Sequence, residues 1–166
     1  MLNIILGPER PAPTTDELHR SHVGYRATMT PQEAYEANHG CWHLGSAADE
    51  ERYVTFSYQG IVVLVIAIES IETESTGRRT LNGPILGPAH PVYDHFAGQP
   101  APTKGRNPVG YFKSEFDLRP CLCRCGGISY NNFLPGHDQR AIHERIGKIG
   151  TVKDFLTWFD EHWTSK

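Results

Sequence analysis

The chain has 166 residues, of which 39% are hydrophobic and 21% are charged, and its formal net charge at pH 7 is −3. This length fits one domain, or one domain with a small appendage, and the composition is typical of a globular chain. The longest apolar run, residues 61–68, is shorter than the ~20 residues of a membrane helix, and MLNIILGPER has no basic signal region. We therefore expect a soluble cytoplasmic protein with no membrane partner.

The first predicted elements are helices. Thr30 has the features of an N-cap, Pro31 suits the first helical position, and Glu33 completes a capping box. These residues predict a helix that ends before Gly40. Residues 14–17, TTDE, offer a similar but weaker start for a short helix ahead of it.

The middle of the chain is expected to form β-structure. YVTFSY at 53–58 alternates, Gln59-Gly60 is a turn signal, and IVVLVIAIESI at 61–71 is rich in β-branched residues, which together predict a hairpin. Its second strand is expected to be central because the run is continuously apolar at first. The Gly/Pro-rich residues 77–108 indicate ordered loops, and VGYF at 109–112 a closing strand.

Two helices are expected near the C-terminus. Asp138 can cap the first, which Gly147 and Gly150 would end, and Thr151 opens the second. The apolar positions of the second helix share one face: Val152, Phe155, Leu156, Phe159 and Trp163.

The sequence therefore indicates an α+β protein that divides at residues 118–120. Residues 1–118 would form a unit built on a curled antiparallel sheet. Residues 119–166 would form a minidomain with a cysteine cluster and two helices. Such a short segment is small for an independent hydrophobic core, so a metal is an attractive way to stabilise it.

Three of the four cysteines alternate in CLCRC, at Cys121, Cys123 and Cys125. A disulfide between cysteines two apart closes a strained ring, and no export signal favours one. Core packing explains an isolated cysteine but not three in five residues. Thiolates are strong ligands for tetrahedral zinc, and Pro135-Gly136 can turn the chain to present His137 as the fourth ligand. These four residues predict a closed, structural zinc site.

One alternative keeps a cysteine outside the metal's coordination sphere, with His143 or Asp138 completing the set. The spacing also departs from the common C-x₂-C pattern. The stretch C-x-C-x-C-G followed by F-x-PGHD-x-R resembles a small zinc-binding motif found in bacterial and phage proteins linked to DNA. The usual glycine between the second and third cysteines is Arg124 here.

Basic residues are concentrated in the second part of the chain. Residues 1–100 carry 6 basic and 12 acidic side chains, whereas residues 101–166 carry 10 basic and 7 acidic ones. A local basic patch can attract nucleic-acid phosphate even in a chain of negative net charge, although a solvated surface explains the same pattern. The candidates for backbone contacts are Lys104, Lys113, Arg119 and Arg124.

The upstream segment resembles the PUA-like superfamily, with the EVE and ASCH domains as the nearest comparison. The resemblance covers residues 23–114 in order of elements and rests on TMTPQEAYEANHGCWHLG, the hairpin, RRTLNGP and GRNPVGYF. It implies a small curled β-barrel with rim helices that binds nucleic acid or a modified base in an aromatic-lined pocket. The residues that it nominates for the pocket are Trp42, Asn82, Arg106, Asn107 and Tyr111. Each of these residues can also be explained as an ordinary core, strand or turn residue.

Three functions remain open at this point. The first is a non-catalytic nucleic-acid reader, of DNA or RNA and of an ordinary or modified base, with zinc as a structural cofactor. The second is an HNH-like nuclease in which His137 is the general base and Asn131, Asp138 or His143 holds a divalent cation. The third is a protein–protein adaptor that uses Trp158, Trp163 and the last helix. The sequence leaves the oligomeric state open.

Overall fold

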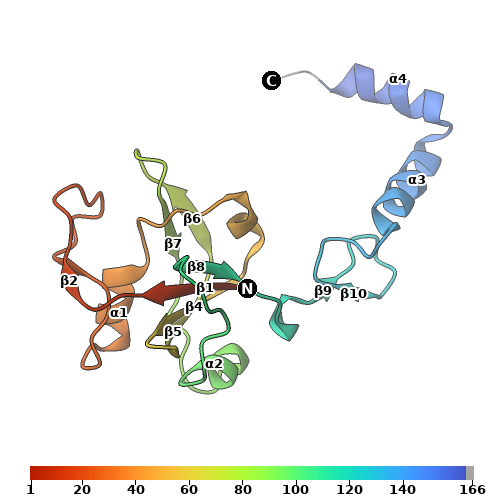
Figure 1. The fold of residues 1–166 in the computed structure, drawn as a ribbon. Helices are drawn as coiled ribbons and strands as arrows, with labels where there is room; N and C mark the ends of the chain where they lie inside the picture. Colours follow the sequence, from red (N-terminus) through yellow and green to blue (C-terminus); the bar gives the residue numbers. More distant parts are fainter. Residues whose placement is uncertain (164–166) are drawn as a thin grey trace. The chain divides into compact units, whose positions relative to one another are not determined.

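The computed structural model describes residues 1–163 of the chain (Figure 1). The chain divides into two compact units, Met1–Asp117 and a second unit that begins at Leu118. Within the described residues, no helix is long and apolar enough to cross a membrane. Each unit has its own helices and strands.

A four-stranded sheet forms the centre of the first unit, in the order β5-β4-β1-β8 (Figure 1). Its strands are β1 (Leu2–Leu6), β4 (Tyr53–Tyr58), β5 (Ile61–Ala67) and β8 (Val109–Tyr111). β1 runs parallel to β4, whereas β8 is antiparallel to β1 and β5 is antiparallel to β4. The N-terminal strand therefore lies in the middle of the sheet, between segments that are distant in sequence.

The predicted hairpin is confirmed as β4 and β5. Gln59 and Gly60 connect the two strands with φ angles of 49° and 82°, the left-handed values that a tight hairpin turn requires. The expectation of a central second strand is wrong, because β5 lies at the edge of the sheet. Its outer backbone groups are instead paired by the Gly/Pro-rich loop, in which Leu86 N–H donates to the carbonyl of Val65 at 2.9 Å.

The continuous apolar run of β5 is explained by burial on both faces. One face packs into a core with β1, β4 and helix α1 (Pro31–Asn38), and contains Leu2, Ile4, Phe56, Ile66 and Leu81 among others. The other face packs against helix α2 (Pro91–Phe96) in a core of Met1, Val62, Val65, Leu86, Val92 and Phe96. α2 was not predicted, because residues 83–108 read as loop.

The capping box predicted for α1 is confirmed, since Thr30 Oγ1 accepts from the Glu33 N–H and the Glu33 carboxylate accepts from the Thr30 N–H. The short helix expected at residues 14–17 does not form. Asp16 instead accepts hydrogen bonds from the Arg20 guanidinium and backbone, which hold the segment as turns. Short 3-10 turns occupy Ser46–Glu50 and Glu115–Asp117.

The strands of the first unit do not close on themselves. Besides the main sheet, the described residues contain two separate two-stranded ladders in this unit: β2 (Arg10–Pro11) with β3 (His22–Val23), and β6 (Ser70–Thr73) with β7 (Arg79–Asn82). The α+β class is confirmed. The predicted curled antiparallel barrel is not confirmed. β1 pairs with β4 in parallel, and the outer strands β5 and β8 do not pair with each other, so the sheet stays open.

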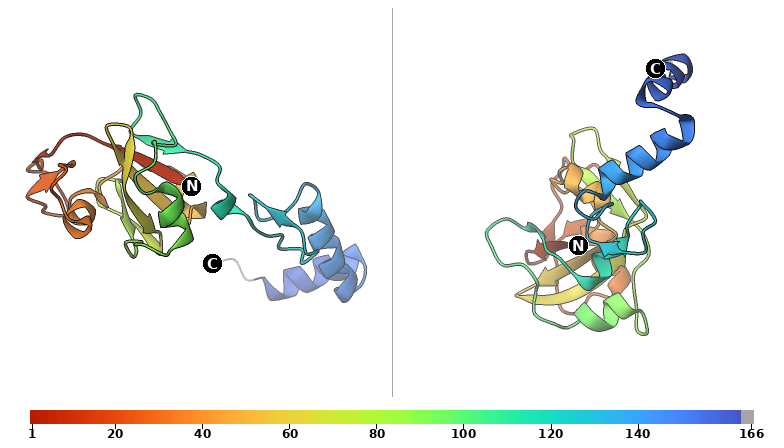
Figure 2. Two further views of the ribbon diagram at one scale, coloured as in Figure 1. Left: turned by 90° about the horizontal axis from the view of Figure 1, so that it is seen from below. Right: turned by 90° about the vertical axis from the view of Figure 1, so that its right-hand side faces the viewer.

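The second unit consists of β9 (Arg119–Pro120), β10 (Ile128–Ser129), α3 (His137–Ile149) and α4 (Val152–His162). Figure 2 shows α3 and α4 as consecutive helices joined by a sharp bend. α3 begins at His137, so Asp138 lies in its first turn and is not its cap. The predicted capping box of α4 is confirmed between Thr151 and Asp154.

This unit has almost no hydrophobic core. Of the hydrophobic side chains in residues 118–163, only Cys121 and Ala141 are buried. So little apolar burial cannot offset the conformational entropy of ordering two helices and a loop. The fold of this unit therefore depends on another source of stability.

Candidate metal centre

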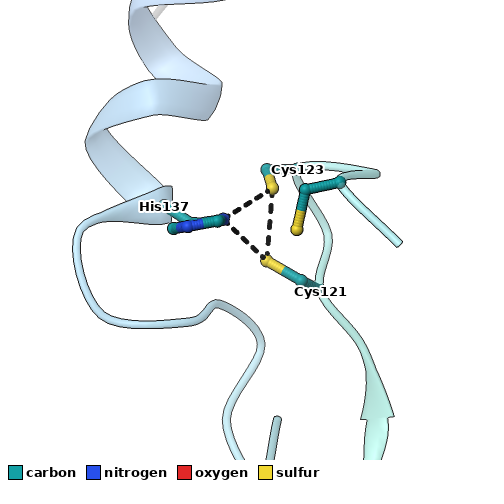
Figure 3. Close-up of side chains that lie close together, drawn as sticks. Cys121, Cys123 and His137 are labelled. Carbon is teal, nitrogen blue, oxygen red and sulfur yellow. Dashed lines mark hydrogen bonds between the residues drawn. The ribbon is translucent and has the colours of Figure 1, made fainter. Parts of the chain in front are cut away.

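The cluster is built from a tight loop and the start of a helix. Cys121 follows β9, Cys123 and Cys125 lie in the loop between β9 and β10, and His137 is the first residue of α3. One ligand atom from each of these four residues lies within 4.8 Å of all the others. Figure 3 shows the imidazole of His137 directed at the sulfurs of Cys121 and Cys123.

The distances fit a tetrahedral metal. The Sγ atoms of Cys121 and Cys123 are 3.3 Å apart, and His137 Nδ1 lies 3.9 Å and 3.1 Å from them respectively. A tetrahedral ion with bonds of ~2.3 Å to sulfur and ~2.0 Å to nitrogen separates its ligand atoms by about 3.5–3.8 Å. The observed spacings bracket this range, so a thiophilic ion fits between the four atoms with small side-chain adjustments.

Backbone hydrogen bonds help to shape the loop. Cys121 N–H donates to the Gly127 carbonyl at 2.8 Å, and Arg124 N–H donates to the Cys121 carbonyl at 2.9 Å. Two left-handed positions, one on each side of Cys125, produce the tight curl: Arg124 has a φ of 63° and Gly126 a φ of 83°. Glycine adopts this conformation without cost, whereas arginine does not.

Two N–H groups point at the sulfurs, as in many metal–thiolate sites. Leu134 N–H donates to Cys121 Sγ, and Gly127 N–H donates to Cys125 Sγ, both at 3.4 Å. A Cβ on Gly127 would lie 2.6 Å from Leu134 Cδ1, so this close approach favours glycine. Such hydrogen bonds stabilise the thiolate form and orient the ligands.

Cys121 and Cys123 titrate as a pair. Burial by itself raises the pKa of Cys121, but the N–H of Leu134 and the neighbouring thiols outweigh it and hold that pKa below its ordinary value. Burial, together with hydrogen bonds to the two other thiols, raises the pKa of Cys123 to about 11. A second thiolate beside the first is thus unfavourable, and a cation is what allows the sulfurs to ionise together.

The alternative ligands do not reach the cluster. His143 and Asp138 are exposed and belong to no metal-binding group in the described residues. The four predicted ligands therefore form the complete set in the structure. Three thiolates and one imidazole leave no open position in a tetrahedral site, as in structural metal centres.

A hollow of about 570 Å³ lies beside the cluster. Its walls include Cys121 itself, the guanidinium-bearing residues Arg124 and Arg145, and the ring of Phe133. Arg124 comes from the β9–β10 loop. Arg145 comes from α3, eight residues after His137, and therefore lies within about 80° of it around the helix axis. Arg145 was not predicted as a binding residue, although its spacing from His137 indicates that the two lie near each other on α3.

The residues nominated for a base pocket do not converge. Trp42 lines a cavity of about 720 Å³ in the first unit, between the end of β1, residues 13–20 and the end of α1. Asn82 ends β7, Tyr111 lies in β8, and Arg106 and Asn107 lie in the preceding loop; none of them lines this cavity. Asn107 accepts a hydrogen bond from Val109 N–H, as a turn residue does.

The Trp42 cavity has a charged rim that the sequence did not reveal. Its charged lining residues are Arg10, Arg20 and Arg78 with Asp16 and Glu17, next to the exposed His43. The Trp42 indole N–H donates to the Asn38 carbonyl at 2.6 Å, which fixes the ring at the cavity wall. These residues come from segments far apart in sequence, so no local pattern predicts their assembly.

The candidate backbone-binding residues are divided between the two units. Lys104 and Lys113 are exposed in the first unit, whereas Arg119 and Arg124 belong to the second. Arg119 donates to the Asn132 side chain at 3.2 Å, while Arg124 is exposed in the β9–β10 loop.

Comparisons with protein-family models, with curated proteins and with solved structures found no match.

Proposed function

We propose that the protein is a nucleic-acid-binding module whose second unit is held together by a structural zinc ion. The observation that carries this proposal is the hollow beside the cluster, in which Arg124, Arg145 and Phe133 meet. Guanidinium groups bind phosphate in a forked geometry, and an aromatic ring offers a surface on which a base stacks. A metal that fixes the loop also fixes these binding groups.

Zinc is the ion that the donor set favours. Three sulfurs and one imidazole nitrogen, in a closed tetrahedral arrangement, match structural zinc sites better than the oxygen-rich sites of magnesium or calcium. The near absence of a hydrophobic core in this unit supports a structural role, because metal binding then supplies much of the folding free energy.

The Trp42 cavity supports a second contact, with a base. Its volume of about 720 Å³ is in the range of small-molecule sites and accommodates a nucleobase with an added substituent. In this proposal the indole stacks on an unpaired or extruded base, while Arg10 and Arg78 approach its phosphates.

The nuclease alternative has less support. A general base must have a lone pair available to water or substrate. With Nδ1 of His137 facing the sulfurs as a metal ligand, the ring proton is on Nε2, so neither nitrogen keeps such a lone pair. The segment that follows His137 is helix α3 rather than a returning strand. The closed ligand set offers no position for a hydrolytic water.

The test is binding of fluorescently labelled single-stranded DNA, duplex DNA and RNA, followed by anisotropy at several salt concentrations. Arg145→Gln should weaken binding to the preferred probe several-fold and lower the salt slope by about one counterion per lost phosphate contact. Arg140→Gln is the matched control: it removes the same charge from the same helix, but Arg140 pairs with Glu144 and does not line the hollow. Equal effects of the two variants, or no binding to any probe, would contradict the proposal.

A further inference from the structure

Helix α4 exposes an apolar face that no other described residue of the second unit covers. None of its residues is buried, and the exposed fractions reach 60% for Val152, 53% for Leu156 and 66% for Trp163, its C-cap. Together with Phe155 and Phe159 these side chains form one stripe, in which the rings of Phe159 and Trp163 stack with centroids 5.5 Å apart. A short helix with such a face is stabilised by a partner rather than by its own propensity.

The charges beside this stripe are arranged for one kind of partner. Lys153 and Asp160 are seven residues apart, two helical turns, so both lie on the same flank of the apolar face. Neither forms an ion pair with another described residue of the second unit, residues 118–163. The opposite flank carries two ring side chains and no Lys, Arg, Asp or Glu, with Trp158 and His162 stacked at 5.2 Å between centroids.

We propose that α4 pairs in antiparallel orientation with α4 of a second copy of this chain. In an antiparallel helix pair the same flanks of the two helices meet, so Lys153 of each copy faces Asp160 of the other. The midpoint between these two residues falls next to Leu156, which is also near the middle of the apolar stripe. The alignment that pairs Lys153 with Asp160 therefore also places the two apolar stripes against each other.

A parallel pair would lose this match. It would bring the flank of Lys153 and Asp160 against the flank of Trp158 and His162, leaving both charges without partners. The antiparallel pair also opposes the two helix dipoles, which is favourable. The surface of one short helix is smaller than the ~800 Å² per partner of a standard interface, so the dimer is weak and reversible.

The first experiment is sedimentation velocity on the full chain, from low micromolar to several hundred micromolar. The wild-type chain should shift from monomer to dimer across this range, and Leu156→Glu should remain monomeric throughout. A wild-type chain that stays monomeric at the highest concentration would overturn the proposal, and would indicate that the face is covered by another part of the same chain or by a different protein.

Charge reversal tests the orientation. Lys153→Glu and Asp160→Lys should each weaken self-association about tenfold, because each replaces two attractions by two repulsions. Both changes favour the helix dipole, so neither is expected to unfold α4. An equimolar mixture of the two variants should restore dimer formation as a heterodimer. Failure of the mixture to recover, despite a wild-type dimer, would contradict the antiparallel pairing.

Discussion

His137 Nδ1 lies 3.1 Å from Cys123 Sγ, although the two residues are 14 positions apart in the sequence. The contact joins the first residue of α3 to the middle of the β9–β10 loop. Because residues 118–163 bury so few apolar side chains, this contact and its companions set where α3 begins and how it is held. A change at the cluster is therefore expected to affect the helix as well as the loop.

Replacing Arg124 with glycine is expected to stabilise the second unit and at the same time to weaken its binding to nucleic acid. Its φ of 63° costs an arginine roughly 1 kcal/mol relative to glycine. We expect Arg124→Gly to raise the free energy of unfolding of the metal-loaded second unit by about 1 kcal/mol, measured by circular dichroism, while weakening nucleic-acid binding. Arg124→Ala loses the same charge but keeps the backbone strain. The two variants should bind alike and differ in stability; equal stability would refute the strain argument.

Asp16 is expected to make the first unit sensitive to acid. A side-chain hydrogen bond from Arg20 is the main cause that lowers the pKa of Asp16 from 3.8 to about 2. A depressed pKa contributes stability above the unfolded value of 3.8, and this contribution is lost as the pH falls toward 2. Asp16→Asn should therefore lower the free energy of unfolding by roughly 2 kcal/mol at pH 7. The gap between variant and wild type should close between pH 4 and pH 2.

The control for this prediction is Glu72→Gln. Glu72 is an exposed carboxylate on β6 of the same unit. Its variant should follow the wild-type unfolding curve at each pH. A gap for Asp16→Asn that stays constant down to pH 2 would show that the Arg20 interaction acts through geometry and not through charge.

Asn38 joins the end of α1 to the turn at Gly24. Its side chain is buried, donates to the carbonyls of Gly24 and Ala34, and accepts from Gly24 N–H at 3.0 Å. Asn38→Ala leaves the polar groups of Gly24 without these partners and should cost about 3 kcal/mol in chemical unfolding. Gln32→Ala, on the exposed side of the same helix, should cost less than about 0.5 kcal/mol. A similar small cost for both would contradict the role given to Asn38.

Trp42 should report directly on a bound base. A single strand that carries 2-aminopurine is expected to lose fluorescence when the analogue stacks on the indole, since stacking on an aromatic ring is the interaction proposed for the cavity. Trp42→Leu should abolish this quenching while leaving anisotropy changes that depend on the arginines of the second unit. Quenching that persists in the variant would place the base elsewhere.

Local chemistry explains which elements were predictable. The capping boxes at Thr30 and Thr151 and the Gln59-Gly60 turn involve residues at most three apart, so their sequence determines their structure. The clustering of Cys121, Cys123, Cys125 and His137 was also predictable, because three clustered thiols followed by a histidine have few other uses. Their assembly needs only one loop and one helix start.

The remaining features depend on contacts between distant segments. The parallel pairing of Leu2–Leu6 with Val54–Tyr58 cannot be deduced from either segment, and the sheet is not the expected barrel because its outer strands β5 and β8 do not pair with each other. α2 lies in a Gly/Pro-rich segment and is stabilised by packing of Val92 and Phe96 against β5. The Trp42 cavity is similarly assembled from several segments, which is why its rim arginines were missed.

The most direct test of the account is the metal content of the chain, measured by native mass spectrometry after purification without added metal. We predict one zinc ion per chain in the wild type and in Cys41→Ser, whose thiol lies outside the cluster. Cys123→Ser and His137→Ala should lose the ion, and hydrogen exchange should show unfolding confined to residues after 117. A wild-type chain without metal, or His137→Ala with full zinc and a folded second unit, would contradict the structural zinc site.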